Sequence, residues 1–370
     1  MIEYENLKKV NNFIYKNYSQ KIQKFLISND FILGKNVSNF EKNFAKFCKT
    51  KYCVGVNSGL DALILSLETL SLKKGSEIIV ASNTYIATIT AIIRLGLKPI
   101  LVEPDLNSYN IDPNKIVKNL SIKTKGIIVT HLYGRPCEMD KIMKIVKKHK
   151  LYLIEDCSQA HGAKFKNKLA GSFGDFGCFS FYPTKNLGAL GDAGAITLNN
   201  KKYYERLLSY RNYGSMIGNK RKYKFIGYNS RLDEIHAAFL NLKLKYLNKI
   251  NNKKKQLAEI YDLNLTDQII KPEKNKNYIN VFHIYNIRLK NQIIRDKLQR
   301  FLFKNKIHTQ IHYPFAPHEH KVYKKYFKKK KYFLSEKIHK TTLSLPISVF
   351  HTKKQINEVC KKINFFFNNY

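Results

Sequence analysis

The sequence predicts an α/β fold, in which a mostly parallel central sheet carries helices on both faces and a smaller α+β domain lies at the C-terminal end. Three observations lead to this prediction. Short apolar runs recur between residues 78 and 154, with enough chain between them for crossover helices. A helical apolar pattern precedes the first run. From about Leu240 the composition changes to that of a lysine-rich helical stretch.

The first predicted element is a helix that begins near Gly59. Apolar residues follow at spacings of three and four, which places them on one buried stripe of a helix. They are Leu60, Leu63, Ile64, Leu67 and Leu70. The polar pair Asn57-Ser58 directly before this pattern is typical of an N-terminal cap.

Short apolar runs of strand type follow the predicted helix. They cover residues 78–80, 100–102, 127–129 and 152–154, and helical segments at 116–120 and 139–149 lie between them. Two more strand-like runs cover residues 176–181 and 195–198. The glycines at 188, 191 and 194 indicate a turn between these last two strands.

The C-terminal third has a different pattern. A lysine-rich helical stretch continues through Lys255, and an alternating segment (278–289), a further helix and a turn-rich run (311–317) follow. No internal repeat and no long Gly/Ser- or Pro-rich linker separates the two parts. We therefore expect two packed domains, residues 1–245 and residues 246–370.

The composition is that of a folded protein. A chain of 370 residues can bury a substantial core, and 44% hydrophobic with 13% aromatic residues argues against disorder. No apolar run approaches the roughly 18 residues that span a bilayer. The N-terminus lacks the basic-then-apolar pattern of a secretory signal, so we expect a cytoplasmic protein with no membrane partner.

A formal net charge of +39 raises the question of a polyanionic partner. The lysines are spread through the whole chain rather than gathered in one arm or on one helix face. This distribution favours a solvated surface that attracts anionic small substrates, with nucleic-acid binding as the alternative.

The six cysteines show no metal-binding spacing. No C-x-x-C pair occurs and no histidine lies at zinc-finger distance from them. We expect reduced, mostly buried thiols and no metal site.

Lys185 and Asp156 are the strongest candidates for chemistry. Lys185 lies between an apolar aromatic strand and a glycine-rich turn, and Asp156 follows an apolar strand at its carboxyl end, where ligands gather in open parallel sheets. A desolvated lysine amine can condense with an aldehyde cofactor, while a carboxylate can hold a pyridine nitrogen protonated. Together they indicate pyridoxal phosphate (PLP), although an exposed loop lysine and a capping aspartate remain the alternatives.

Further residues fit the same cofactor. The run Asn57-Ser58-Gly59-Leu60 offers backbone N–H groups at a helix N-terminus, which suits a phosphate, and Ser180 could add a hydroxyl. Gln159 could donate to a ring hydroxyl or be an exposed amide. Tyr85 could stack on the ring or be a core tyrosine.

Several motifs occur in one order and carry a family resemblance. They are residues 57–63 (NSGLDAL), 82–88 (SNTYIAT), 131–136 (HLYGRP), 155–162 (EDCSQAHG), 179–195, 227–234 (GYNSRLDE) and 311–314 (IHYP). The chain resembles the DegT/DnrJ/EryC1/StrS family of PLP-dependent sugar aminotransferases from about residue 31 to residue 346, and the lysine segment is highly specific.

The resemblance implies the PLP-dependent transferase fold type I, also called the aspartate aminotransferase-like fold. It also implies a homodimer with active sites at the subunit interface. In this fold, residues 1–245 would form the large PLP-binding domain and residues 246–370 the small C-terminal domain. Lys185 resembles the lysine that forms the Schiff base with PLP, and Asp156 resembles the partner of the pyridine nitrogen. Some relatives become dehydratases by replacing this lysine with histidine, and this chain keeps Lys185.

The other site residues are carried over by motif. Gln159 matches the position near the ring hydroxyl, Tyr85 matches the stacking aromatic, and Asn229 matches an asparagine that reaches the phosphate from the other subunit. Gly59, Leu60 and Ser180 match phosphate-binding positions, and His312 and Tyr313 resemble a segment near the sugar.

The finer expectation concerns the substrates. The segments 83–88 and 131–136 look most like those of enzymes that make 3-amino-3,6-dideoxyhexoses on thymidine diphosphate (dTDP), with L-glutamate as the amino donor. A UDP- or GDP-linked 4-keto-sugar is the alternative substrate. His236 and His320 stand where glutamine is more usual, and Cys157-Ser158 replaces small residues beside the aspartate.

Overall fold

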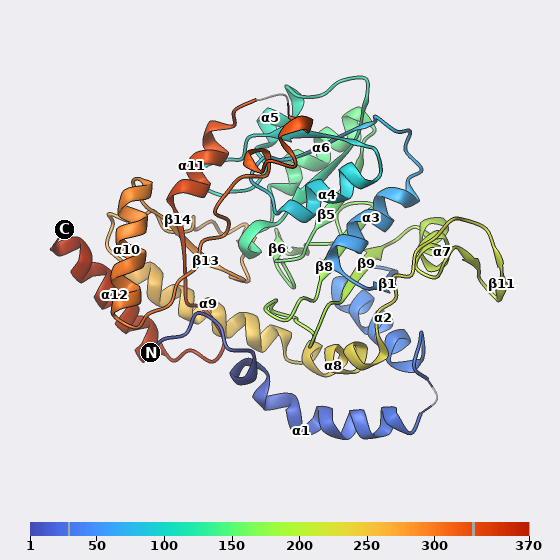
Figure 1. Ribbon diagram of the computed structural model, residues 1–370, viewed down its shortest axis with the longest axis horizontal. Coiled ribbons are helices and arrows are strands. Elements are labelled where there is room, and N and C mark those ends of the chain that lie inside the picture. The colour runs from blue at the N-terminus through green and yellow to red at the C-terminus, as the bar shows by residue number, and fades with distance from the viewer. Residues whose placement is uncertain (29, 328–329, 370) are drawn as a thin grey trace.

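A seven-stranded sheet forms the centre of the molecule, for which the computed structural model describes residues 1–28, 30–327 and 330–369 (Figure 1). The strand order is β1 (Tyr52–Val56), β9 (Gly194–Leu198), β8 (Phe176–Ser180), β5 (Tyr152–Asp156), β4 (Thr124–Thr130), β2 (Glu77–Ala81) and β3 (Lys98–Val102). The pairs from β8 across to β3 are parallel, and β9 is antiparallel to both β1 and β8. The predicted mostly parallel sheet is confirmed, whereas strand β1 was not predicted.

Helices cover both faces of this sheet, as predicted. Ile78 and Val80 of β2 pack in one apolar cluster with helices α3 (Gly59–Thr69) and α4 (Ile86–Arg94). The alternate residues Ile79 and Ala81 pack in another cluster with α5 (Pro113–Val117) and α6 (Met139–His149). Successive side chains of a strand point to opposite faces, so the central strands are buried on both sides.

Other helices extend this core. Helices α2 (Lys35–Cys48) and α8 (Glu234–Leu244) pack around Phe179 and Phe181, and α1 (Leu7–Leu26) lies against α8. Helix α7 (Lys201–Tyr210) follows strand β9. The short strands outside the central sheet are β6 (Lys164–Phe165), β7 (Lys168–Leu169), β10 (Ser215–Met216), β11 (Asn219–Tyr223) and β12 (Tyr278–Ile279). The 3₁₀ helices are η1 (Leu132–Gly134), η2 (Pro317–Glu319) and η3 (Lys324–Tyr326).

The C-terminal part has its own apolar core. The antiparallel pair β13 (Tyr285–Arg288) and β14 (Thr342–Leu345) packs with α9 (Leu247–Asn264), α10 (Gln292–Lys304) and α12 (Lys353–Asn368), and α11 (Phe333–Thr341) precedes β14. Ile2 belongs to the same core and forms a bridge with Ile307. The predicted boundary at residue 245 falls between α8 and α9, and the division into two domains stays a proposal.

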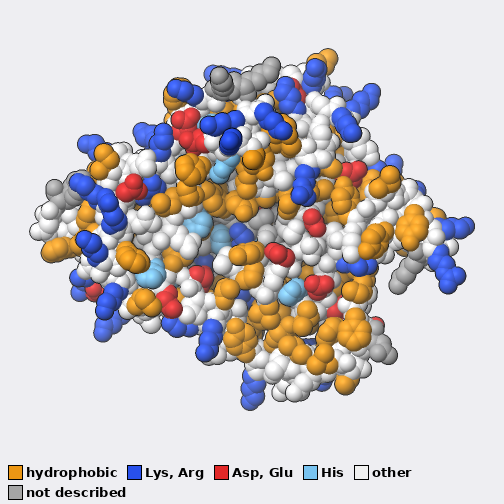
Figure 2. Space-filling model, in the orientation of Figure 1, with side chains coloured by type: hydrophobic (Ala, Val, Ile, Leu, Met, Phe, Trp, Pro, Cys, Tyr) orange, Lys and Arg blue, Asp and Glu red, His pale blue; other side chains and the backbone are white. Residues whose placement is uncertain are grey.

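The positively charged side chains are dispersed over the surface that Figure 2 draws. On the face drawn in Figure 2, lysine and arginine side chains are scattered among hydrophobic and neutral ones and do not gather in one patch. Among the described residues, no helix combines the length and the apolar character needed to cross a membrane.

Candidate active site

Asp156 lies at the carboxyl end of β5, where the sequence predicted it, and is 3% exposed. The Thr88 hydroxyl donates to its Oδ2 atom at 2.9 Å, and the Ser158 backbone N–H donates to Oδ1 at 3.1 Å. Thr88 belongs to α4, which follows β2, and Ser158 follows β5, so residues after two different strands fix this carboxylate.

Lys185 lies in the connection between β8 and β9, within a tight turn. Its N–H donates to the Tyr182 carbonyl oxygen at 2.8 Å, and a Cβ atom on Gly188 would lie 2.2 Å from the Pro183 oxygen. Only glycine therefore fits at position 188, which accounts for part of the predicted glycine-rich turn. The turn leaves the Lys185 side chain partly buried at the sheet edge.

The structure brings Lys185 and Asp156 into one electrostatic site. Burial lowers the pKa of Lys185 to about 8, the Asp156 carboxylate raises this pKa, and Lys254 lowers it further. An amine with this pKa is partly neutral near physiological pH and can act as a nucleophile or a base. The alternative of a solvated loop lysine does not fit this environment.

Histidines that the sequence analysis did not assign to the site surround Lys185. The Nε2 atom of His283 lies 3.5 Å from Lys185 Nζ, and burial together with the Lys185 charge holds the pKa of His283 well below its usual range. Burial and then Lys185 lower the pKa of His161 to about 3. These rings are therefore neutral at physiological pH. His283 comes from the segment before β13, far away in the sequence, so no local pattern marks it.

Gln159, Tyr313 and Tyr85 lie together on one side of the site. The Gln159 amide nitrogen donates to the Tyr313 hydroxyl at 3.0 Å, and its oxygen accepts from the Tyr133 N–H at 2.7 Å. The rings of Tyr85 and Tyr313 have centroids 5.0 Å apart, and Tyr85 is 46% exposed. Two predicted cofactor residues and one predicted substrate residue are therefore neighbours.

His312, the other predicted substrate residue, adjoins the same site. Its Nδ1 atom lies 2.9 Å from the Ser344 hydroxyl. Burial and the Lys185 charge lower the pKa of His312 to about 4. A cavity of about 80 Å³ lies between His312, His283, Thr184 and the N-terminal residues Tyr4 and Glu5.

The predicted phosphate residues meet at the N-terminus of α3. A Cβ atom on Gly59 would lie 2.5 Å from the Cβ of Ser180, so the glycine allows helix and strand to approach closely. Ser58 caps the helix by accepting from the Asp61 N–H at 3.1 Å. The N–H groups of Gly59 and Leu60 belong to the first helical turn, which has no intrahelical acceptors and suits an anion.

Asn229 lies apart from this group. Its side chain is exposed, and its backbone forms an isolated bridge with Asn212. The neighbouring Ser230 hydroxyl accepts from the Asn57 N–H at 3.2 Å, which places this segment beside the start of α3. The predicted contact of Asn229 with the phosphate of a second subunit stays a prediction.

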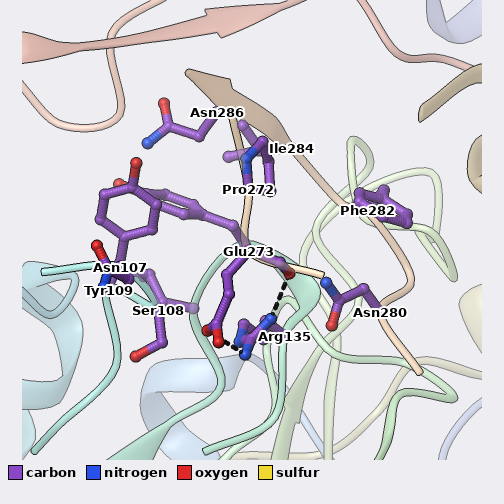
Figure 3. Close-up of a pocket in the computed structure, with 12 residues that line it drawn as sticks. Asn107, Ser108, Tyr109, Arg135, Pro272, Glu273, Asn280, Phe282, Ile284 and Asn286 are labelled. Atoms are coloured by element: carbon purple, nitrogen blue, oxygen red, sulfur yellow. Dashed lines mark hydrogen bonds and ion pairs between the residues drawn. The ribbon is translucent and has the colours of Figure 1, made fainter. Parts of the chain in front are cut away.

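A second, smaller cavity of about 20 Å³ adjoins Tyr133 (Figure 3). Arg135 closes one side by an ion pair with Glu273, whose Oε2 lies 2.6 Å from Nη2. The buried Tyr109 hydroxyl and the Asn286 amide nitrogen line it without a protein partner. This volume holds about one water molecule and is too small for a sugar nucleotide.

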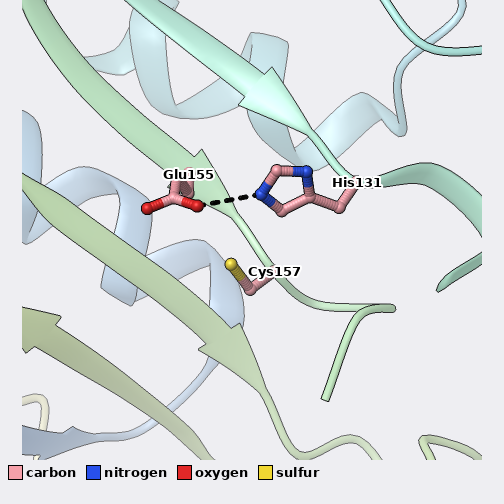
Figure 4. A group of neighbouring side chains, drawn as sticks. All are labelled: His131, Glu155 and Cys157. Atoms are coloured by element: carbon pink, nitrogen blue, oxygen red, sulfur yellow. Dashed lines mark hydrogen bonds and ion pairs between the residues drawn. The ribbon is translucent and has the colours of Figure 1, made fainter. Parts of the chain in front are cut away.

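A buried group of possible metal ligands, His131, Glu155 and Cys157, lies on the other side of β5 (Figure 4). His131 uses both ring nitrogens, since Nδ1 accepts from the Cys137 N–H at 3.0 Å and Nε2 lies 3.0 Å from Glu155. Burial raises the pKa of the Cys157 thiol well above its usual value. These contacts favour a structural role over metal ligation, because thiolate and free imidazole nitrogen are the metal-binding forms.

Comparison with known proteins agrees with the geometry. A model of the DegT/DnrJ/EryC1/StrS aminotransferase family matches residues 13–364. The chain is 44% identical over 367 residues to the dTDP-3-amino-3,6-dideoxy-alpha-D-galactopyranose transaminase of Aneurinibacillus thermoaerophilus, with 98% of this chain and 99% of that relative covered.

Solved structures show the same similarity over nearly the full length. The crystal structure of S. venezuelae DesV has a TM-score of 0.94 at 34% identity and covers 99% of this chain and 98% of its own. The structure of NtdA from Bacillus subtilis, with bound cofactor PMP, has a TM-score of 0.89 at 27% identity and covers 97% and 85%. The chain therefore belongs to the DegT/DnrJ/EryC1/StrS aminotransferase family and is a pyridoxal-phosphate-dependent aminotransferase.

Proposed function

We propose that the protein transfers the amino group of L-glutamate to a dTDP-linked 3-keto-6-deoxyhexose, giving the dTDP-linked 3-amino-3,6-dideoxyhexose. The observation that carries the chemistry is the partly buried Lys185 amine, with its pKa lowered to about 8, which interacts electrostatically with the Asp156 carboxylate at the sheet edge. The name of the Aneurinibacillus relative supports the substrate.

The residues present fit pyridoxal 5′-phosphate. The N-terminus of α3, with Gly59, Leu60 and Ser180, would hold the phosphate, because a side chain at position 59 would fill the gap. Asp156 has one side-chain donor and one backbone donor, which leaves lone pairs for a protonated pyridine nitrogen. When bound, the cofactor supplies an electron sink for the negative charge that develops on the donor's α-carbon.

Lys185 acts as the base and acid of the reaction in this proposal. Because its pKa is low, the free amine can take a proton from the substrate carbon and return it at neutral pH. The neighbouring His283 ring is neutral and can accept a hydrogen bond from the Lys185 ammonium without competing as a second positive charge. Asp156 keeps its place through Thr88 and Ser158.

The substrate side of the site is formed by aromatic rings, of which Tyr85 is exposed and Tyr313 partly buried. Tyr85 and Tyr313 form a tilted pair, with Tyr85 open to solvent, where it can cover the cofactor ring. His312 and Tyr313 lie next to them and are proposed to contact the sugar. The net charge of +39 favours a substrate with a diphosphate, and this attraction weakens as salt is added.

We also propose a homodimer with shared active sites. Asn229 is exposed on the single chain, yet its segment adjoins the N-terminus of α3. A second subunit placed over this surface would bring its own Asn229 toward the phosphate end. Cross-linking through a cysteine at position 229 tests this arrangement.

The test of the proposed function is an amino-transfer assay with purified protein, PLP and L-glutamate. We expect turnover of dTDP-3-keto-6-deoxyglucose and none after Lys185→Ala. Consumption of only a UDP- or GDP-linked 4-keto-sugar would contradict the proposed substrate but keep the chemistry. Wild-type turnover by Lys185→Ala would contradict the assignment of the lysine. Salt-sensitive binding of duplex DNA without any turnover would favour the nucleic-acid alternative.

A further inference from the structure

Lys254 is a buried lysine that the mechanism above does not use. It is 4% exposed, while its neighbour Lys255 on the same helix α9 is exposed. It occupies a position in the buried stripe of α9, between Ile250 and Leu257. Lysine is almost never fully buried unless its ammonium group is paired, so the partners of Lys254 indicate its role.

The ammonium group of Lys254 contacts two residues beside Lys185. Its Nζ atom donates to Asn186 Oδ1 at 2.9 Å and to the His283 carbonyl oxygen at 3.2 Å. Asn186 directly follows Lys185, and the His283 ring lies 3.5 Å from Lys185 Nζ. One buried cation therefore holds the turn that carries Lys185 and the backbone of His283, whose ring contacts Lys185.

Asn186 is held by further hydrogen bonds besides the one from Lys254. It is 4% exposed, and its amide nitrogen donates to Asn251 Oδ1 and to the Val281 carbonyl oxygen, both at 2.9 Å. Asn251 lies on α9, as Lys254 does. The Lys185 turn is thus attached to α9 by two residues of one helical turn.

The charges around Lys185 come from several elements. Asp156 of β5 raises the pKa of Lys185, and Lys254 of α9 lowers it. The rings of His161, His283 and His312 also face Lys185, and each has a lowered pKa. Of these groups, Lys254 is the one that adds positive charge at neutral pH.

The surroundings of Lys254 decide whether it is charged. Burial lowers the pKa of Lys254 to about 8, and the Glu5 carboxylate, from the N-terminal segment, raises it. Lys243 of α8, His283 and His351 lie in the same electrostatic environment. Lys254 is therefore mostly protonated at pH 7.

We propose that Lys254 is a positioning residue for Lys185, which fixes the adjacent residue Asn186 and the backbone of His283 and, by its own positive charge, favours the neutral, proton-accepting form of the Lys185 amine. A second ammonium nearby disfavours the charged form of a lysine. The inference rests on the proposed function, since it assigns Lys254 to the same site. A lysine with only a structural role would affect stability but not the protonation of Lys185.

The experiment measures the protonation of Lys185 without turnover. For this experiment, full-length protein is loaded with pyridoxamine 5′-phosphate. Its amine cannot form a Schiff base with a lysine, so the Lys185 amine stays free. Trace acetylation with acetic anhydride between pH 6 and pH 10, read by peptide mass spectrometry, gives the pH midpoint at which Lys185 becomes reactive. The variants are Lys254→Met, which removes the charge, Lys254→Arg, which retains it, and Lys255→Met as the matched exposed control.

We expect Lys254→Met to raise the Lys185 midpoint by about one pH unit. Lys255→Met should leave the midpoint at the wild-type value. An unchanged midpoint in Lys254→Met, or an equal rise in Lys255→Met, overturns the proposal. If Lys254→Met does not fold, Lys254→Arg decides alone: its guanidinium stays charged over the whole range, so a midpoint at or below the wild-type value supports the proposal and a rise overturns it.

The two proposals fail separately. A raised midpoint in Lys254→Met, in a protein that aminates no keto-sugar, supports the role of Lys254 and overturns the proposed substrate. Turnover of the dTDP-sugar with an unmoved Lys185 midpoint supports the proposed function and overturns the role of Lys254.

Discussion

Glu155 and Asp156 are adjacent carboxylates in β5, yet their hydrogen bonding differs. Glu155 points to one face of the sheet and accepts four hydrogen bonds, from His131 and from the N–H groups of residues 171, 173 and 174. Asp156 points to the other face, accepts two from the described residues and interacts electrostatically with Lys185. A carboxylate has about four acceptor sites, so Glu155 is saturated and Asp156 keeps capacity for a ligand.

This difference indicates a structural role for Glu155 and a chemical role for Asp156. A buried charge that is fully hydrogen-bonded stabilises its surroundings and has nothing left to offer a substrate. A buried charge with free acceptor sites costs stability in the absence of a ligand and contributes to binding when the ligand arrives. Matched substitutions at the two positions test this distinction.

The largest expected effect is the loss of stability when Glu155 is substituted. Glu155→Gln replaces one acceptor oxygen by an NH₂ group, which then faces either the two N–H donors to Oε1 or the His131 ring and the N–H donor to Oε2. It also removes the negative charge beside His131. We expect a loss of about 3–5 kcal/mol in the free energy of unfolding, measured by chemical denaturation. A loss below 1 kcal/mol would show that the four contacts do not hold the fold together.

Asp156→Asn should have the opposite profile. Asparagine has the same shape, but it lacks the negative charge that we propose holds the pyridine nitrogen protonated. We expect a roughly hundredfold to thousandfold fall in kcat, with a melting temperature close to that of the wild type. Activity near the wild-type level, or a destabilisation equal to that of Glu155→Gln, would remove the contrast between the two residues.

The thiol beside Glu155 predicts a pH dependence of stability. Burial raises the pKa of Cys157 well above its usual value, so the folded state keeps a proton that the unfolded thiol releases above about pH 9. This stabilisation is complete below pH 9 and is lost as the pH rises, by about 1.4 kcal/mol per pH unit for one thiol. The unfolding free energy of Cys157→Ala should therefore fall less steeply between pH 9 and pH 10 than that of the wild type. Parallel slopes would mean that the thiol ionises equally in both states.

The smallest effect concerns one of the two donors to Asp156. Thr88→Val removes the 2.9 Å hydrogen bond to Oδ2 and keeps the shape of the side chain. Because this bond goes to a charged acceptor, we expect a roughly tenfold fall in kcat/KM with little change in stability. An effect as large as that of Asp156→Asn would mean that Thr88 does more than orient the carboxylate.

Much of this architecture follows from local sequence patterns. The apolar runs predicted the parallel strands, and the Ser58 cap with its apolar stripe predicted α3. Strand β1 was missed because it pairs antiparallel with β9, more than a hundred residues away, and contains Gly55. Gly55 is needed there because a Cβ atom would lie 2.9 Å from Leu232.

Motifs marked the residues of the candidate site, whereas residues that only the fold brings to Lys185 were missed. Lys185, Asp156 and Gln159 lie in motifs, whereas His283 reaches Lys185 only after the C-terminal part has packed on the sheet edge. Lys254 did have a signal. It lies in the lysine-rich helical stretch that continues through Lys255, and its spacing from Ile250 and Leu257 places it on the buried face of α9.

The most direct test of the central claim is to find the lysine that combines with the cofactor. Borohydride reduction of the PLP-loaded protein fixes the cofactor to its lysine, and peptide mass spectrometry then locates it. We predict one pyridoxyl group per chain, on Lys185, in wild type and in Asp156→Asn. A pyridoxyl group on another lysine, or none on any, would contradict the account.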